Sequence, residues 1–197
     1  FSPSDIQSIV KKAIVERLKG VYSLQWFPET GAEYPIRISF MKDEAVVCLD
    51  TTGLSLHKRG YRKLTAKAPI AENLAAALIE LTPWNAGRIL VDPFCGSGTF
   101  PIEAAMIALD RAPGLNRPFD MEKWGCADKA GMEALRSEAR ERFEAAKRTR
   151  TVEVFGSDRD ERVLRLAAAH RAQAGLNGFV RLERKDLREA QVPVPRG

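Results

Sequence analysis

The chain has 197 residues, of which 45% are hydrophobic and 29% are charged; these values are ordinary for a globular protein and argue against extended disorder. No apolar run approaches the ~20 residues that a bilayer span requires, and no basic segment followed by an apolar one opens the chain, so we expect neither a membrane span nor a secretory signal. The net charge of +5 and the pI near 9.2 mildly favour a polyanionic partner.

Three cysteines and two histidines are spread along the chain without a recognisable spacing. Cys48, Cys95 and Cys126 fit neither a disulfide framework nor a paired metal-ligand motif. The two histidines, His57 and His170, are too few to complete a zinc site with them, so we expect no metal. This cysteine usage favours a reducing, cytoplasmic compartment.

The first fifty residues predict one helix and one hairpin. Ser2 followed by Pro3 is typical of a helix N-terminus, and apolar residues then recur at helical spacing until Gly20, which should end the helix. Residues 35–41 and 45–50 read as strands separated by a polar turn. This pattern predicts an antiparallel hairpin.

The apolar periodicity lapses between residues 51 and 67, where cations gather around Gly60 and Tyr61 without any acidic residue. We place a candidate domain boundary in this stretch. A basic stretch between two domains favours contacts with nucleic-acid phosphates, and a solvated linker is the alternative. The five cations are Lys58, Arg59, Arg62, Lys63 and Lys67.

A helix follows, opened by Pro69 and ended by Pro83. Its spacing predicts that one apolar face is buried. That face consists of Ile70, Leu74, Leu78 and Leu81.

The rest of the chain alternates strands with helices. Strands are predicted over 88–92, 151–155 and 179–183, with helices over 99–109, 128–150 and 160–175. The helix over 128–150 carries few apolar residues and should largely face water. The alternation predicts an α/β fold with a parallel sheet and right-handed crossovers.

The most informative residues are the eight from Asp92 to Thr99, Asp-Pro-Phe-Cys-Gly-Ser-Gly-Thr, between a predicted strand and a predicted helix. Backbone N–H groups and the positive helix terminus at such a turn favour an anionic or polar ligand. A P-loop would need a lysine after Gly98, and a dinucleotide fingerprint would need glycine where this chain has Pro101. The remaining ligand has a ribose, an adenine and an amino-acid tail but no phosphate, and Asp92 can help to hold the tail's ammonium.

Acids also follow the next two predicted strands. Asp158 and Asp160 could accept hydrogen bonds from ribose hydroxyls, and Asp186 could accept one from an adenine amino group. These strand ends should meet at one edge of the sheet, where open α/β folds bind ligands. The alternatives are helix N-caps for Asp158 or Asp160 and a plain loop acid for Asp186. Cys95 is expected to be a buried packing residue rather than a nucleophile, and both histidines to be structural or surface groups.

Five segments carry a family resemblance: His57-Lys-Arg-Gly-Tyr-Arg62, Ala68-Pro-Ile-Ala-Glu72, the turn from Asp92 to Thr99, Ala112-Pro-Gly-Leu-Asn-Arg117 and Gly156-Ser-Asp-Arg-Asp160. Together they closely resemble the THUMP-domain RNA methyltransferases, which methylate guanine N2 in large-subunit (23S) ribosomal RNA. The resemblance runs over essentially the whole chain. It implies that residues 1–60 are the C-terminal part of an α+β THUMP RNA-binding domain. Residues 61–197 would then be the N-terminal part of a Rossmann-like class I methyltransferase domain.

The resemblance also implies S-adenosylmethionine (SAM) as the cofactor. The family's catalytic signature, Asn or Asp followed by Pro, Pro and Tyr or Phe after a fourth strand, is absent from this sequence, so no catalytic residue is assigned. Two other functions stay open: an adenine-N6-specific DNA methyltransferase, a label that the family has often carried, and a non-catalytic RNA-binding protein. The implied cofactor-binding residues are Asp92, Pro93, Phe94, Gly96, Gly98, Thr99, Asp158, Asp160 and Asp186.

Overall fold

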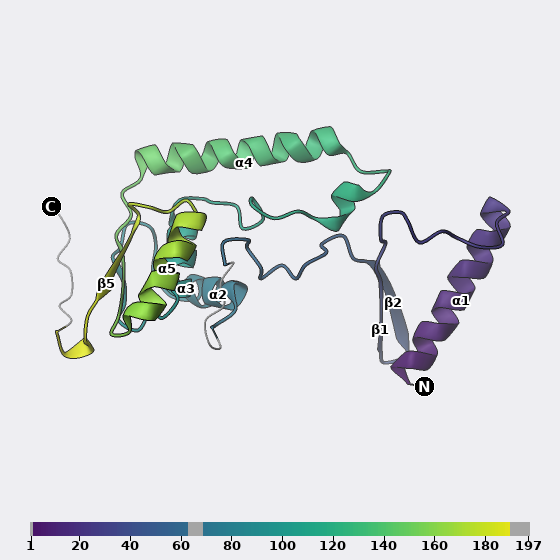
Figure 1. The fold of residues 1–197 in the computed structure, drawn as a ribbon, viewed down its shortest axis with the longest axis horizontal. Coiled ribbons are helices and arrows are strands. Elements are labelled where there is room, and N and C mark those ends of the chain that lie inside the picture. The colour runs from purple at the N-terminus through teal and green to yellow at the C-terminus, as the bar shows by residue number, and fades with distance from the viewer. Residues whose placement is uncertain (1, 63–68, 190–197) are drawn as a thin grey trace. The chain divides into compact units, whose positions relative to one another are not determined.

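The structure is a computed structural model that describes residues 2–62 and 69–189. The chain divides into two compact units, Phe1–Glu33 and Tyr34–Gly197, whose elements are labelled in Figure 1. Within the described residues, no helix is both long enough and apolar enough to cross a membrane. The three cysteines, all of them described, are free thiols.

The first unit contains one helix, α1 (Pro3–Tyr22). Ser2 caps it, because its hydroxyl accepts a hydrogen bond from the backbone N–H of Asp5 and the Asp5 carboxylate accepts one from Ser2. The predicted start is therefore confirmed. The predicted stop at Gly20 is wrong, because the helix continues to a left-handed residue, Ser23, with φ 54°.

The second unit opens with the predicted hairpin. Strand β1 (Ile36–Met41) pairs antiparallel with β2 (Glu44–Leu49), and Met41 faces Glu44 across the turn. The two turn residues, Lys42 and Asp43, have φ of 50° and 63°, the left-handed conformation that matches the twist of a tight hairpin. The hairpin is confirmed.

A three-stranded parallel sheet forms the centre of the second unit, in the order β3 (Leu90–Asp92), β4 (Val154–Asp158) and β5 (Val180–Arg184). The predicted α/β fold is confirmed. Strand β4 begins three residues later than predicted and runs to Asp158, so this acid ends the strand rather than following it.

Helix α3 (Thr99–Ala108) follows β3, and α5 (Glu161–Gln173) connects β4 to β5. Figure 1 shows both helices beside the strands. Eight of the ten residues of α3 are buried, which explains its run of alanines, since small side chains allow close packing. Its Ile102 and Met106 belong to the same core as Val154 and Val180 of the sheet.

Helix α2 (Glu72–Glu80) packs against α3, but not through the predicted face. The structure buries Glu72, Ala75 and Ile79, because small Ala75 permits close packing and Glu72 has a buried ionic partner described below. The prediction for the apolar face is therefore wrong. Leu74, Leu78 and Leu81 are 50%, 41% and 83% exposed.

A long connection separates α3 from β4. It contains the 3-10 turn η1 (Asp120–Lys123) and the helix α4 (Lys129–Thr149), of which only Phe143 and Ala146 are buried. The prediction that this helix largely faces water is confirmed. After β5 the described chain ends in a short 3-10 turn, η2 (Leu187–Glu189).

Candidate functional site

The chain turns from β3 into α3 through two glycines in the left-handed conformation, Gly96 with φ 52° and Gly98 with φ 84°. The two differ in their surroundings. A Cβ added at Gly98 would lie 3.0 Å from the Cβ of Ala167, whereas one added at Gly96 would meet nothing within 4 Å. Gly98 therefore allows α3 to approach α5, and Gly96 leaves bare backbone facing open space that a ligand can approach.

The turn is tied to the neighbouring strand β4. The Asp158 carboxylate accepts a hydrogen bond from the backbone N–H of Gly96 at 3.1 Å, and the Ser157 carbonyl accepts one from Cys95 at 2.9 Å. Close packing supports the same junction, because a Cβ on Gly156 would lie 3.0 Å from Pro101 and 3.1 Å from Cys95. The close helix-to-sheet approach that a dinucleotide site obtains from a third glycine in its turn is here provided by a glycine in the strand.

Asp92 lies at the end of β3, beside Asp158. Its carboxylate accepts a hydrogen bond from the backbone N–H of Phe94 at 3.0 Å. Burial raises the pKa of Asp92, and the nearby charge of Asp158 raises it further. Two carboxylates at adjacent strand ends thus create a local negative charge, which favours a ligand with a cationic group.

Asp186 follows β5 and pairs with Arg188 at 2.9 Å. Hydrogen bonds from the Arg188 side chain and backbone lower the pKa of Asp186 to about 2. It lies in a pocket of about 600 Å³ together with Pro93, Phe94 and Asp158. The structure therefore brings these predicted residues of three strand ends into one pocket.

A second pocket of about 470 Å³ is lined by Asp92, Gly96 and Thr99. Phe94 lines both pockets and is 68% exposed, so the two pockets share this residue at the edge of the sheet. Gly98 lines neither pocket.

Asp160 differs from the other predicted acids. It is the N-cap of α5, and its carboxylate accepts a hydrogen bond from the backbone N–H of Arg162 at 2.8 Å. It also lies outside the residues that line the two pockets. Asp160 is thus the N-cap of α5, as the alternative predicted, and Asp158 lines a pocket; the ribose contact of each acid stays a prediction.

The remaining nucleophile and histidine predictions are confirmed where the structure tests them. Cys95 is 7% exposed, and burial raises the pKa of its thiol to about 12, so it is a packing residue. His170 is 1% exposed, and its Nδ1 lies 3.1 Å from the carbonyl oxygen of Ser97. This histidine on α5 therefore contacts the backbone of the glycine turn.

The structure contradicts the predicted phosphate contacts for two of the five cations. Arg59 forms an ion pair with Glu103 at 3.5 Å, and Arg62 forms one with Glu72 at 3.6 Å; the arginine side chains are only 12% and 11% exposed. Their charges are neutralised by buried glutamates within the protein. Lys58 is exposed, and Lys63 and Lys67 lie outside the described residues, so for these three the contact stays a prediction.

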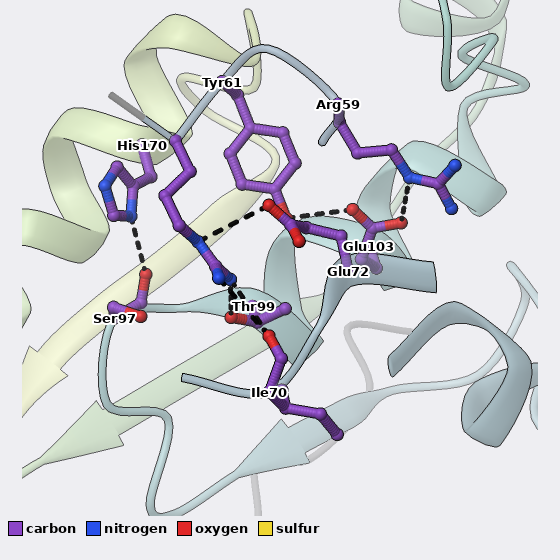
Figure 2. A network of polar contacts seen from close by, with 9 residues as sticks. Arg59, Tyr61, Ile70, Glu72, Ser97, Thr99, Glu103 and His170 are labelled. Atoms are coloured by element: carbon purple, nitrogen blue, oxygen red, sulfur yellow. Dashed lines mark hydrogen bonds and ion pairs between the residues drawn. The ribbon is translucent and has the colours of Figure 1, made fainter. Parts of the chain in front are cut away.

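The partners of these arginines form a buried polar network that sequence reasoning missed. The Tyr61 hydroxyl donates to Glu103 at 2.9 Å, and Figure 2 shows Tyr61, Glu103 and Arg59 next to one another. Burial raises the pKa of Glu103, although Arg59 and Tyr61 oppose this shift. One signal was present: Glu103 interrupts an otherwise apolar helix, while the basic stretch has no acid of its own.

A glycine turn between the first strand and its helix, with acids at or just after the ends of three parallel strands, defines a methyltransferase-like α/β domain. Among the described residues, no group of three or more His, Cys, Asp or Glu side chains could hold a metal ion. Residues 59–194 match the family described as UPF0020, RMKL-like, methyltransferase domain. The chain belongs to this family.

Several relatives are similar along nearly the whole chain. YpsC of Bacillus subtilis (strain 168), named "Putative RNA methyltransferase", is 44% identical over 95% of this chain and 49% of its own length. The crystal structure of "a predicted N6-adenine-specific DNA methylase" from Listeria monocytogenes str. 4b F2365 is 40% identical with a TM-score of 0.91, over 98% of this chain and 50% of that one.

A third relative is described with a ligand. The crystal structure of SMU.472, "a putative methyltransferase complexed with SAH", is 42% identical with a TM-score of 0.88, over 100% of this chain and 51% of that one. The chain thus spans about half the length of each of these three relatives.

Proposed function

We propose that this chain is the cofactor-binding part of a SAM-dependent RNA methyltransferase. The observation that carries the proposal is the arrangement at the edge of the sheet, where Asp92, Asp158 and Asp186 surround a glycine turn and two pockets. The relative SMU.472, described as complexed with SAH, supports a ligand of the same chemistry here.

The residues fit SAM by their chemistry. The paired charges of Asp92 and Asp158 suit the ammonium of the amino-acid tail, and the open backbone at Gly96 allows a nucleoside to approach. Asp158 and Asp186 can accept hydrogen bonds from ribose hydroxyls and from the adenine amino group, respectively. Phe94 and Pro93 supply apolar surface beside them.

The remaining predicted residues shape the starts of the two helices that follow the strand ends. Gly98 and Thr99 form the start of α3, and Asp160 enters the proposal as the cap that holds the start of α5. When bound, SAM supplies an electrophilic methyl group to an exocyclic nitrogen of the target base. No residue of this chain is proposed as catalytic, because its sequence lacks the family signature.

We further propose that the substrate is 23S ribosomal RNA, methylated at guanine N2, and that residues 1–60 belong to a THUMP RNA-binding domain. The name of YpsC supports an RNA substrate, as does the net charge of +5. The family match begins at residue 59, close to the proposed boundary between 1–60 and 61–197. A reducing, cytoplasmic compartment stays a prediction from the cysteines.

The cofactor part is tested by calorimetry with SAH, ATP and NAD. We expect SAH to bind, and ATP and NAD not to bind. Binding of ATP or NAD in its place would contradict the proposal, because the turn lacks the lysine and the third glycine that these ligands require.

The substrate part is tested with the whole protein of which this chain is proposed to be the cofactor-binding part. It is incubated with labelled SAM and either ribosomal RNA or duplex DNA, and the nucleosides are then analysed by mass spectrometry. N2-methylguanosine in the RNA is expected. N6-methyladenine in the DNA would instead favour the function named for the Listeria monocytogenes relative. RNA binding without any SAH binding would identify a non-catalytic RNA-binding protein.

A further inference from the structure

Arg62 joins three parts of the second unit through one side chain. Its Nη2 donates to the Thr99 hydroxyl at 2.5 Å, and both terminal nitrogens lie 3.3 Å from the Ile70 carbonyl oxygen. Its Nε lies 3.6 Å from a Glu72 carboxylate oxygen, as an ion pair. Figure 2 shows Thr99, Ile70 and Glu72 close to one another. One guanidinium therefore connects the segment before α2, the start of α2 and the start of α3.

Two of these contacts are with walls of the candidate cofactor pocket. Thr99 and Ile70 line the pocket of about 470 Å³ that also contains Asp92 and Gly96. Arg62 is absent from that lining and instead borders a separate pocket of about 560 Å³, with Lys58 among its other residues. Arg62 thus lies outside this pocket and can act on it only through Thr99 and Ile70.

The chemistry of the contact suits a rigid support. Thr99 is the first residue of α3, directly after left-handed Gly98, and it is 4% exposed. A charged donor forms a stronger hydrogen bond than a neutral one, and the planar guanidinium can hold several acceptors in fixed directions. Glu72, itself 4% exposed, neutralises the charge of the Arg62 guanidinium, because a buried charge is unfavourable without a partner.

We propose that Arg62 is a positioning residue for the cofactor: it fixes the start of α3, and so the shape of the glycine turn, through the Thr99 hydroxyl. This role rests on the proposed function for its ligand, SAM. The structural part, that Arg62 holds the turn, can be measured without any ligand.

The chain supplies a matched control in Arg59. Arg59 lies in the same segment as Arg62, is about equally buried and also pairs with a buried glutamate. Its partner, Glu103, lies on α3 one helical turn after Thr99. Arg59→Met and Arg62→Met each leave one buried glutamate without its arginine. They should therefore cost similar stability, while only Arg62→Met removes the contact with Thr99.

The experiment measures hydrogen exchange of the amides between Cys95 and Ile102 in the ligand-free protein, together with the Kd for SAH. In Arg62→Met we expect these amides to exchange about tenfold faster and SAH to bind about tenfold more weakly, the change that follows the loss of one charge-assisted hydrogen bond. In Arg59→Met both quantities should stay within about twofold of the unchanged protein.

Two milder variants keep the test valid if Arg62→Met does not fold. Arg62→Lys retains a charge beside Glu72 but cannot hold Thr99 and Ile70 together, so it should recover stability without recovering SAH affinity. Thr99→Val removes the hydroxyl and leaves Arg62 paired, and should loosen the same amides. The effects of Arg62→Lys and Thr99→Val on amide exchange should be less than additive, because both variants remove the same contact between Arg62 and Thr99.

The readouts separate two failures. Unchanged exchange between Cys95 and Ile102 in all the Arg62 and Thr99 variants, or an equal increase in Arg59→Met, overturns the positioning role. If the unchanged protein does not bind SAH, the cofactor assignment is wrong and the proposed role toward SAM fails with it, while the exchange data alone decide whether Arg62 holds the turn.

Discussion

The carboxylate of Asp158 at the end of β4 accepts a hydrogen bond from the backbone N–H of Gly96, 62 positions earlier in the chain, at a distance of 3.1 Å. This contact joins the second strand end to the turn that follows the first. Asp158 therefore has two tasks in the proposed site. Its second carboxylate oxygen accepts a hydrogen bond from the Asp160 backbone N–H at 2.9 Å. The side chain thus holds the turn, and it also lines the pocket of about 600 Å³.

Replacing Asp158 should weaken SAH binding by more than the loss of a single ligand contact. For Asp158→Ala we expect about a tenfold to hundredfold higher Kd, because both the ligand and Gly96 lose a charged acceptor. Calorimetry gives the Kd, and Glu183→Gln on the neighbouring strand is the control. An unchanged Kd in a folded Asp158→Ala protein would remove Asp158 from the site.

The two glycines of the turn should respond differently to the same substitution. Gly96→Ala should cost about 1–2 kcal/mol from its left-handed backbone and should also reduce SAH binding, because its methyl group would occupy open space at the turn. Gly98→Ala carries the same strain and in addition crowds Ala167 at 3.0 Å, so it should be the less stable of the two. Urea unfolding and calorimetry together check this; normal SAH affinity in Gly96→Ala would show that the ligand does not approach there.

The charge of the Asp92 carboxylate should lower the stability of the ligand-free protein at neutral pH. Its pKa is raised in the folded state, so the folded protein binds the proton more tightly than the unfolded chain, and stability falls as pH rises from 3.8 through the raised value. Asp92→Asn should therefore raise the Tm at pH 7 and weaken SAH binding, while its stabilising effect disappears below pH 3.8.

Thermal unfolding of Asp92→Asn from pH 3 to pH 8 checks this expectation. Asp43→Asn, in the hairpin turn, is the control. A lower Tm for Asp92→Asn at pH 7 would mean that its charge stabilises the fold, contrary to the burial that raises its pKa.

Asp160 should affect stability and not the cofactor. Asp160→Ala removes the cap of α5 and should cost about 0.5–2 kcal/mol, whereas Asp160→Ser retains a capping oxygen and most of that stability. The SAH affinity of Asp160→Ser should stay within about twofold of that of the unchanged protein, since the Asp160 carboxylate is engaged in the capping hydrogen bond. A large loss of affinity in Asp160→Ser would restore Asp160 as a ligand contact.

Lys58 is the described cation of the basic stretch that remains available for RNA. If it contacts a phosphate, Lys58→Ala should reduce the slope of log affinity against log salt concentration by about one unit. Binding of ribosomal RNA at several salt concentrations measures the slope. Lys147→Ala, on α4 and paired with Glu144, is the control, and an unchanged slope in Lys58→Ala would make Lys58 a solvated surface residue.

The face of α2 shows where periodicity alone misleads. Spacing favoured Leu74, Leu78 and Leu81, because they are large and apolar, but the helix packs through Ala75 and Ile79. A pattern of apolar residues indicates that a helix has a face to bury, whereas the fit against α3 decides which face it is. The boundary of β4 was misjudged for a related reason, since its pairing with β5 extends the strand to Asp158, two residues beyond its pairing with β3.

Local information in the sequence was enough to predict the strand, glycine turn and helix around Asp92 to Thr99, and the acids that end the neighbouring strands, because periodicity, glycines and parallel topology act over short stretches. The tertiary structure alone decided the use of the charges. Arg59 and Arg62 resembled a basic surface in the sequence, yet Arg59 pairs with buried Glu103 of α3 and Arg62 pairs with buried Glu72 at the start of α2. Burial and pairing depend on which segments fold against each other, and a charge in the sequence does not show whether it faces water or a partner.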